Sequence, residues 1–192
     1  MSKLLSAQLA TVEAPAWLRS TGIVLAASIL VGICAHIAVP FYFTPVPLTM
    51  APFAVLLLGL LLSPRLAAAS LCAYLIEGSL GLPVFVPSPL YGLAHLLGPT
   101  GGYLIAYPPA AAIIAILFRR SGRTFTAALA SAAAGNVVIL FCGALWMAAL
   151  THASARVVFT IAVLPFLAGD ALKVAAAAGI AAGFERLRNF AR

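Results

Sequence analysis

Long apolar runs separated by short polar or proline-containing breaks dominate the chain. A helix needs about 20 mostly apolar residues to cross the hydrocarbon core of a membrane. On this basis we predict six membrane-spanning helices, at residues 21–39, 48–62, 66–80, 103–118, 125–150 and 157–184. The expected fold is therefore all-α, a polytopic membrane bundle of six transmembrane helices.

The segment between the third and fourth predicted helices, GLPVFVPSPLYGLAHLLGPTGG (81–102), is apolar but rich in glycine and proline. Its four prolines interrupt the hydrogen-bond ladder of a helix, so it cannot be one regular helix. Irregular backbone exposed to lipid would leave polar groups unpaired. We therefore expect this outer loop to fold against the bundle or to line a cavity.

Composition supports a membrane protein. Of the 192 residues, 64% are hydrophobic and 8% are charged, and the mean hydropathy is +1.14. A soluble domain has about 25% charged residues, so a soluble enzyme and a disordered chain are excluded. We expect a single membrane domain over 1–192: a surface segment at 1–20, the bundle at 21–184 and a basic tail at 185–192. We expect no ATPase domain, so any energy from ATP would come from partners.

The net charge of +7 is distributed unevenly along the predicted topology. If the N-terminus is cytoplasmic, nine of the eleven basic residues are cytoplasmic: Lys3, Arg19, Arg65, Arg119, Arg120, Arg123, Arg186, Arg188 and Arg192. Arg156 alone lies outside, and Lys173 lies within a span. The positive-inside rule then predicts that both termini are cytoplasmic. The basic excess reflects membrane orientation, and we expect no nucleic-acid partner.

Asp170 and Lys173 lie deep in the last predicted span. Ionisable groups in this zone are costly and usually face a cavity or each other. Their i,i+3 spacing puts them on one helix face, within pairing reach. Two interpretations stay open: a structural ion pair, or the polar floor of a ligand site. In such a site Asp170 would accept N–H bonds and Lys173 would donate to a carbonyl or carboxylate.

Six further side chains are candidate ligand contacts, because each offers a hydrogen bond within apolar surroundings: Glu77, Tyr91, His95, Thr100, Tyr103 and Asn136. We expect one or two of the four in or beside the loop, Tyr91 to Tyr103, to touch a ligand. Glu77 could instead be a satisfied interface carboxylate, and Asn136 could bond a neighbouring helix. The histidines, cysteines and carboxylates lack metal-site spacing, so we expect no metal.

Two stretches of the loop resemble the BioY family, namely GLPVF (81–85) and LLGPTGGYLI (96–105). Pro47-Leu48-Thr49, Ser63-Pro64-Arg65 and the D-x-x-K pattern at Asp170 and Lys173 agree with it. The resemblance covers about residues 20–184. The chain departs from the family at Ala51, where many relatives have glutamine, and at VPSPLYGLAH (86–95), where relatives are often glycine-rich.

The resemblance implies a biotin-binding S component of an energy-coupling-factor (ECF) transporter in the cytoplasmic membrane of a prokaryote. Biotin would enter from outside beneath the loop and meet Asp170 and Lys173. The implied partners are a transmembrane coupling protein and two ATPase subunits, which alone would use ATP. No cofactor and no catalysis are expected of the chain itself.

Small residues of the first span would form the docking face for these partners: Ala27, Ser28, Gly32 and Ala35. Packing inside the monomer is the alternative for Ser28 and Gly32, because small side chains let helices approach closely. Three other functions are weighed against biotin transport. They are an S component for another vitamin, a small channel or proton-coupled carrier, and an intramembrane enzyme, whose catalytic cluster is not visible in the sequence.

Overall fold

The computed structural model describes residues 15–190 and is mostly helical. Its helices are α2 (Ala16–His36), α3 (Ala51–Leu61), α4 (Pro64–Ser79), α5 (Gly92–Leu96), α6 (Gly101–Arg120), α7 (Phe125–Thr151), α8 (Ala155–Ala162) and α9 (Leu167–Phe190). A 3₁₀ turn, η1 (Leu164–Phe166), separates α8 from α9. Two short antiparallel strands, β1 (Ala38–Val39) and β2 (Leu48–Thr49), were not expected for an all-α chain.

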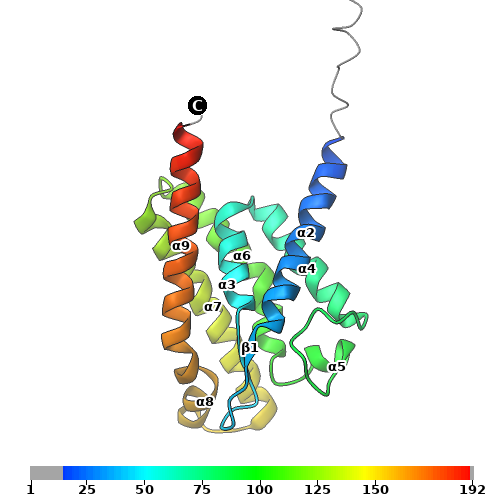
Figure 1. Cartoon of the computed structure of the whole chain (residues 1–192). Coiled ribbons are helices and arrows are strands. Elements are labelled where there is room, and N and C mark those ends of the chain that lie inside the picture. The colour runs from blue at the N-terminus through cyan, green and yellow to red at the C-terminus, as the bar shows by residue number, and fades with distance from the viewer. Residues whose placement is uncertain (1–14, 191–192) are drawn as a thin grey trace, which may run out of the picture.

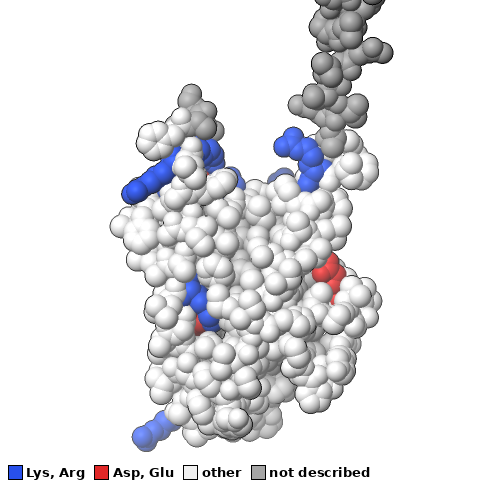
Figure 2. Space-filling model, in the orientation of Figure 1, with Lys and Arg blue, Asp and Glu red and all other residues white. Residues whose placement is uncertain are grey.

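The described chain begins and ends at the same end of the molecule (Figure 1). We call this the basic end, because Lys and Arg side chains gather there (Figure 2). The β1–β2 hairpin, α5 and α8 lie at the opposite end, which we call the loop end (Figure 1). At the basic end Glu185 of α9 pairs with Arg123 at 3.1 Å and with Arg188 at 2.8 Å.

Four helical segments are long and apolar enough to cross a membrane: Ala16–His36, Gly101–Arg120, Phe125–Thr151 and Ala155–Arg188. The protein is therefore a multi-pass membrane protein. The helix of the second predicted span is shorter than the expected 48–62, since α3 has 11 residues, whereas α4, with 16 residues, is close to the expected 66–80. At 1.5 Å per residue α3 is about 16 Å long, well below the hydrocarbon thickness of about 30 Å.

The expected surface segment at 1–20 overlaps the start of α2 where the structure describes it. Helix α2 already begins at Ala16, so residues 16–20 extend the first long helix. Apolar Trp17 and Leu18 make this extension compatible with the helix that follows. Residues 1–14 of that prediction, and 191–192 of the predicted basic tail, lie outside the described residues.

The last predicted span, 157–184, is not one continuous helix. Pro165 has no backbone N–H to continue the ladder, and Val163 adopts φ −128° and ψ −58°. The freed carbonyls find side-chain donors: the Thr44 hydroxyl donates to the oxygen of Ile161 at 2.8 Å, and the Tyr103 hydroxyl donates to the oxygen of Ala162. These two hydrogen bonds connect the break to the segment between α2 and α3, through Thr44, and to α6, through Tyr103.

Helix α6 lies at the centre of the bundle, packed against α3, α4 and α7. Its start, in the GPTGG motif, needs glycine for close packing. A Cβ on Gly102 would lie 2.2 Å from the Cβ of Trp146 on α7. The Trp146 indole donates to the carbonyl of Gly98 at 2.9 Å, which fastens the end of the loop to α7. The motif therefore packs the loop and α6 against α7.

The GLPVF motif fastens the start of the loop to α2 and α4. Val84 packs over Gly32, where an added Cβ would meet it at 3.4 Å. The Phe85 ring covers Gly78, where an added Cβ would lie 2.2 Å from the ring. Phe85 also meets Tyr74 edge-on at 5.3 Å between ring centroids and stacks on His95 at 5.0 Å. These contacts hold the loop on the bundle.

Candidate functional site

A cavity with an empty volume of about 570 Å³ lies between the bundle and the loop. Its walls come from α2, α3, α4, α6, α7, η1 and α9, and from the segments 46–49 and 86–100. Most of the lining is apolar or aromatic, with a few polar groups among it. This composition is typical of sites for small molecules.

Asp170 and Lys173 form the charged part of the cavity wall. Both are buried, with 4% and 6% of their surface exposed. The Lys173 ammonium donates to Asp170 Oδ1 at 2.9 Å, and the Asn136 amide donates to Oδ2 at 3.2 Å. The other two N–H groups of Lys173 have no protein acceptor among residues 15–190. An ammonium in this position can donate to a bound molecule.

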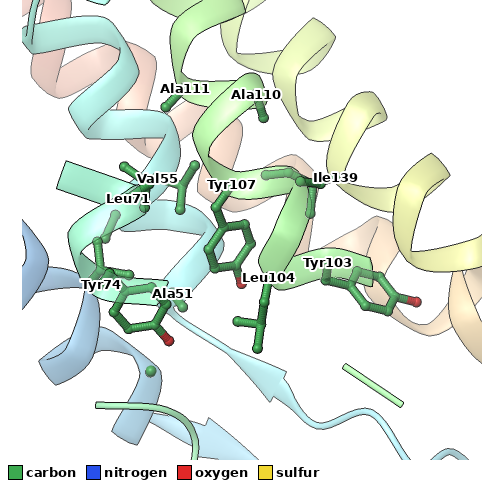
Figure 3. Packing of buried hydrophobic residues seen from close by; sticks show 14 of the residues in the cluster. Ala51, Val55, Leu71, Tyr74, Tyr103, Leu104, Tyr107, Ala110, Ala111 and Ile139 are labelled. Atoms are coloured by element: carbon green, nitrogen blue, oxygen red, sulfur yellow. The ribbon is translucent and has the colours of Figure 1, made fainter. Parts of the chain in front are cut away.

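Two tyrosines also stand in the cavity wall. Tyr74 of α4 and Tyr107 of α6 lie with ring centroids 6.4 Å apart. Figure 3 shows that their hydroxyls project from the two helices toward the same side. The Tyr74 hydroxyl is buried and has no hydrogen-bond partner within the described part of the chain. Such a group costs free energy unless a ligand or water pairs with it.

Tyr103 and Phe166 form an apolar wall. Their rings meet edge-on at 6.1 Å between centroids, and both line the cavity. Because the Tyr103 hydroxyl already donates to Ala162, Tyr103 offers its ring to the cavity. The sequence predicted Tyr103 at the site, and the structure assigns it this apolar role.

His95 and Thr100 line the roof of the cavity, on the loop. The His95 Nε2 lies 3.3 Å from the Thr100 hydroxyl, and Nδ1 lies 2.9 Å from the Ser88 hydroxyl and 3.2 Å from the Leu90 oxygen. Burial lowers the pKa of His95, although the bond to Leu90 opposes this effect. Burial thus disfavours the charged imidazole, and both of its nitrogens are used to shape the roof.

Three predicted contacts lie outside the cavity lining. Tyr91 is 74% exposed. The Glu77 carboxylate accepts a hydrogen bond from Ser28 on α2 at 2.9 Å, as the alternative of an interface carboxylate expects. The Asn136 amide donates to Asp170, and its own Oδ1 is buried without a partner in the described part of the chain. None of these three residues is among those that line this cavity.

The predicted docking residues are also buried. Ala27, Ser28 and Ala35 are 5%, 0% and 2% exposed, and Gly32 packs under Val84. A partner cannot reach side chains inside the bundle, so a docking face made of these residues is corrected to a packing face. Their small size lets α2 approach α4 and the loop. The exposed side of α2 carries larger residues, Leu25, Ile29 and Ile33.

Sequence analysis missed Tyr74, Tyr107 and Phe166. Tyr74 and Tyr107 lie in apolar stretches whose composition predicts only membrane-spanning helices. A tyrosine hydroxyl deep in a membrane needs a polar partner, and this requirement could have identified both. Among the described residues, no group of three or more His, Cys, Asp or Glu side chains could hold a metal ion.

Comparisons with known proteins agree on one family. The BioY family model matches residues 4–190. The chain is 43% identical over 145 residues to the "Probable biotin transporter BioY" of Pyrococcus horikoshii. The aligned residues cover 76% of this chain and 82% of that protein. It is 32% identical over 164 residues to the "Biotin transporter BioY" of Thermotoga maritima, covering 85% and 93%.

The fold matches a solved structure, the S-component for biotin from an ECF-type ABC transporter. The TM-score is 0.80, the identity is 23%, and the match covers 88% of this chain and 92% of that one. The fold is thus that of a transporter S component. With the family model covering nearly the whole chain, the protein belongs to the BioY family.

Proposed function

We propose that this protein is the membrane-embedded biotin-binding subunit, or S component, of an ECF transporter, and that it mediates biotin uptake. The observation that carries the proposal is the buried Asp170–Lys173 pair in the wall of a largely apolar cavity. The names of its relatives support biotin as the ligand.

The chemistry of the cavity suits biotin. Biotin has a ureido ring with two N–H donors and a carbonyl, an apolar bicycle and a carboxylate tail. The Asp170 carboxylate can accept N–H bonds, while the Lys173 ammonium and the Tyr74 hydroxyl can donate. The rings of Tyr103 and Phe166 can pack against the bicycle. No cofactor is needed for this binding.

We propose six spans, with α8, η1 and α9 together forming the last. Both termini then face the cytoplasm of a prokaryote, because the basic end carries most of the Lys and Arg residues. The energy would come from a transmembrane coupling protein and two ATPase subunits, which alone use ATP. The exposed side of α2, with Leu25, Ile29 and Ile33, is the docking surface that we propose in place of its buried small residues.

Uptake of labelled biotin tests this function. Cells lacking biotin synthesis and their own biotin uptake should accumulate label when they express the chain with a coupling module. Asp170→Asn should abolish most of the uptake, because the amide cannot replace the anion beside Lys173. Glu77→Gln, the same change outside the cavity, is the control and should keep uptake. Equal uptake by both variants would contradict the proposal.

A further inference from the structure

A second hollow, separate from the substrate cavity, opens on the outer surface between α7 and α8. We call it the α7–α8 groove. It has an empty volume of about 1060 Å³, and its walls are almost wholly apolar. Its main side chains are Val137, Phe141, Leu145 and Ala148 of α7 and Val158 and Phe159 of α8. Val137, Phe141 and Leu145 are more than half exposed, so no segment among residues 15–190 covers this side.

The length of the groove matches a single membrane leaflet. Its α7 wall runs from Val137 to Ala148, which spans about 16 Å along the helix. One leaflet of the hydrocarbon core is about 15 Å thick, half of the whole. A partner helix would cross both leaflets and continue past the groove. A lipid acyl chain would end where the groove ends.

The start of α8, next to the groove residue Ala155, carries one arginine. Arg156 is exposed at the start of α8, between the groove residues Ala155 and Phe159. The first turn of α8 adds free N–H groups, because the Ser154 side chain makes no capping hydrogen bond. Helix α8 lies at the loop end, away from the basic end (Figure 1). A phosphate at a helix start beside an arginine is well stabilised.

We propose that the α7–α8 groove is a binding site for an anionic phospholipid. One acyl chain lies along α7, and the phosphate is held by Arg156 and the start of α8. The groove would retain one lipid, whereas the remaining apolar surface would contact lipids that exchange with the bilayer. Leu140 lines both the groove and the substrate cavity, so the acyl chain would also support the cavity wall from behind.

Native mass spectrometry of the purified full chain tests the site. After removal of bound lipid, phosphatidylglycerol should rebind with a stoichiometry of one and should be retained better than phosphatidylcholine. Ala148→Leu fills the groove and should abolish retention of phosphatidylglycerol. Arg156→Gln should weaken it by about fivefold, the effect of one basic residue near an anionic headgroup. It should change phosphatidylcholine retention much less.

The matched control is Ala176→Leu, the same enlargement at an exposed position of α9. It should leave phosphatidylglycerol retention unchanged. Size-exclusion profiles of the variants check that each remains folded. Equal retention by Ala148→Leu and Ala176→Leu would overturn the proposal, as would equal retention of the two lipids by the unmodified chain. A second protein copy that replaces the lipid on the groove would also overturn it.

Discussion

At the residue scale, the cavity contains polar groups in two states. The Asp170 oxygens are both engaged, one by Lys173 and one by Asn136. The Tyr74 hydroxyl is buried without a partner in the described chain, while the Tyr103 hydroxyl is satisfied by Ala162. The Tyr103 hydroxyl, which is satisfied without ligand, serves the fold, whereas the unsatisfied Tyr74 hydroxyl is available to the ligand. This difference separates two tyrosines of the same cavity.

Replacing each tyrosine by phenylalanine tests that difference. Tyr74→Phe should not lower the thermal stability of the ligand-free protein, because it removes an unpaired polar atom. It should weaken biotin binding by about fivefold, the value of one hydrogen bond. Tyr103→Phe should destabilise the ligand-free protein by about 1 kcal/mol, since it leaves the Ala162 carbonyl unpaired. Thermal unfolding and calorimetry measure the two effects, and the same response from both variants would contradict this account.

Sequence analysis singles out residues whose type is unusual for their surroundings. Asp170 and Lys173 are rare charges in an apolar run, and the structure brings both to the cavity. Spacing along one helix cannot tell which neighbouring helix a side chain faces. For this reason Glu77 was taken as a candidate although it faces Ser28, and Tyr91 although it points outward.

At the element scale, the long helices follow from apolar length. Helices α6 and α7 lie within a few residues of the predicted spans. The break at Pro165 was missed because apolar residues surround it and hydropathy does not register a lost N–H. The strands β1 and β2 are too short to leave a pattern. The loop depends on glycines that face particular rings, which only the packed structure reveals.

Gly78→Ala tests how α4 holds the loop. An added methyl would collide with the Phe85 ring at 2.2 Å and displace the GLPVF segment. We expect lower thermal stability and at least tenfold weaker biotin binding, roughly the effect of an overpacked core on the roof of the site. In Gly179→Ala on α9, the new Cβ has nothing within 4 Å. That variant should be neutral or more stable, because alanine favours a helix. Equal effects of the two changes would contradict the proposed role of Gly78.

At the scale of the whole molecule, two features combine. The charges divide the bundle into a basic end and a loop end, and the cavity lies beneath the loop. A ligand entering at the loop end meets the cavity before it meets the bundle core. This arrangement fits the proposed uptake, in which the ligand enters from outside and the energy source lies on the cytoplasmic side.

Single cysteines in a chain lacking Cys34, Cys72 and Cys142 test the orientation. Ser121→Cys lies in the turn after α6 at the basic end, and Ser154→Cys lies before α8 at the loop end. In intact cells a membrane-impermeant thiol reagent should label Ser154→Cys and leave Ser121→Cys unlabelled. After the cells are lysed, both should react. The opposite pattern in intact cells would reverse the proposed topology.

Biotin binding to the purified protein is the most direct test of the central claim. Isothermal titration in detergent should give one biotin per chain, with no response to other vitamins. Asp170→Asn and Lys173→Met should each weaken binding at least tenfold, about the cost of losing one charged hydrogen bond in a buried site. Glu77→Gln should bind like the unmodified chain. No binding at micromolar biotin, or unchanged binding by both cavity variants, would contradict the assignment of this pair to the biotin site.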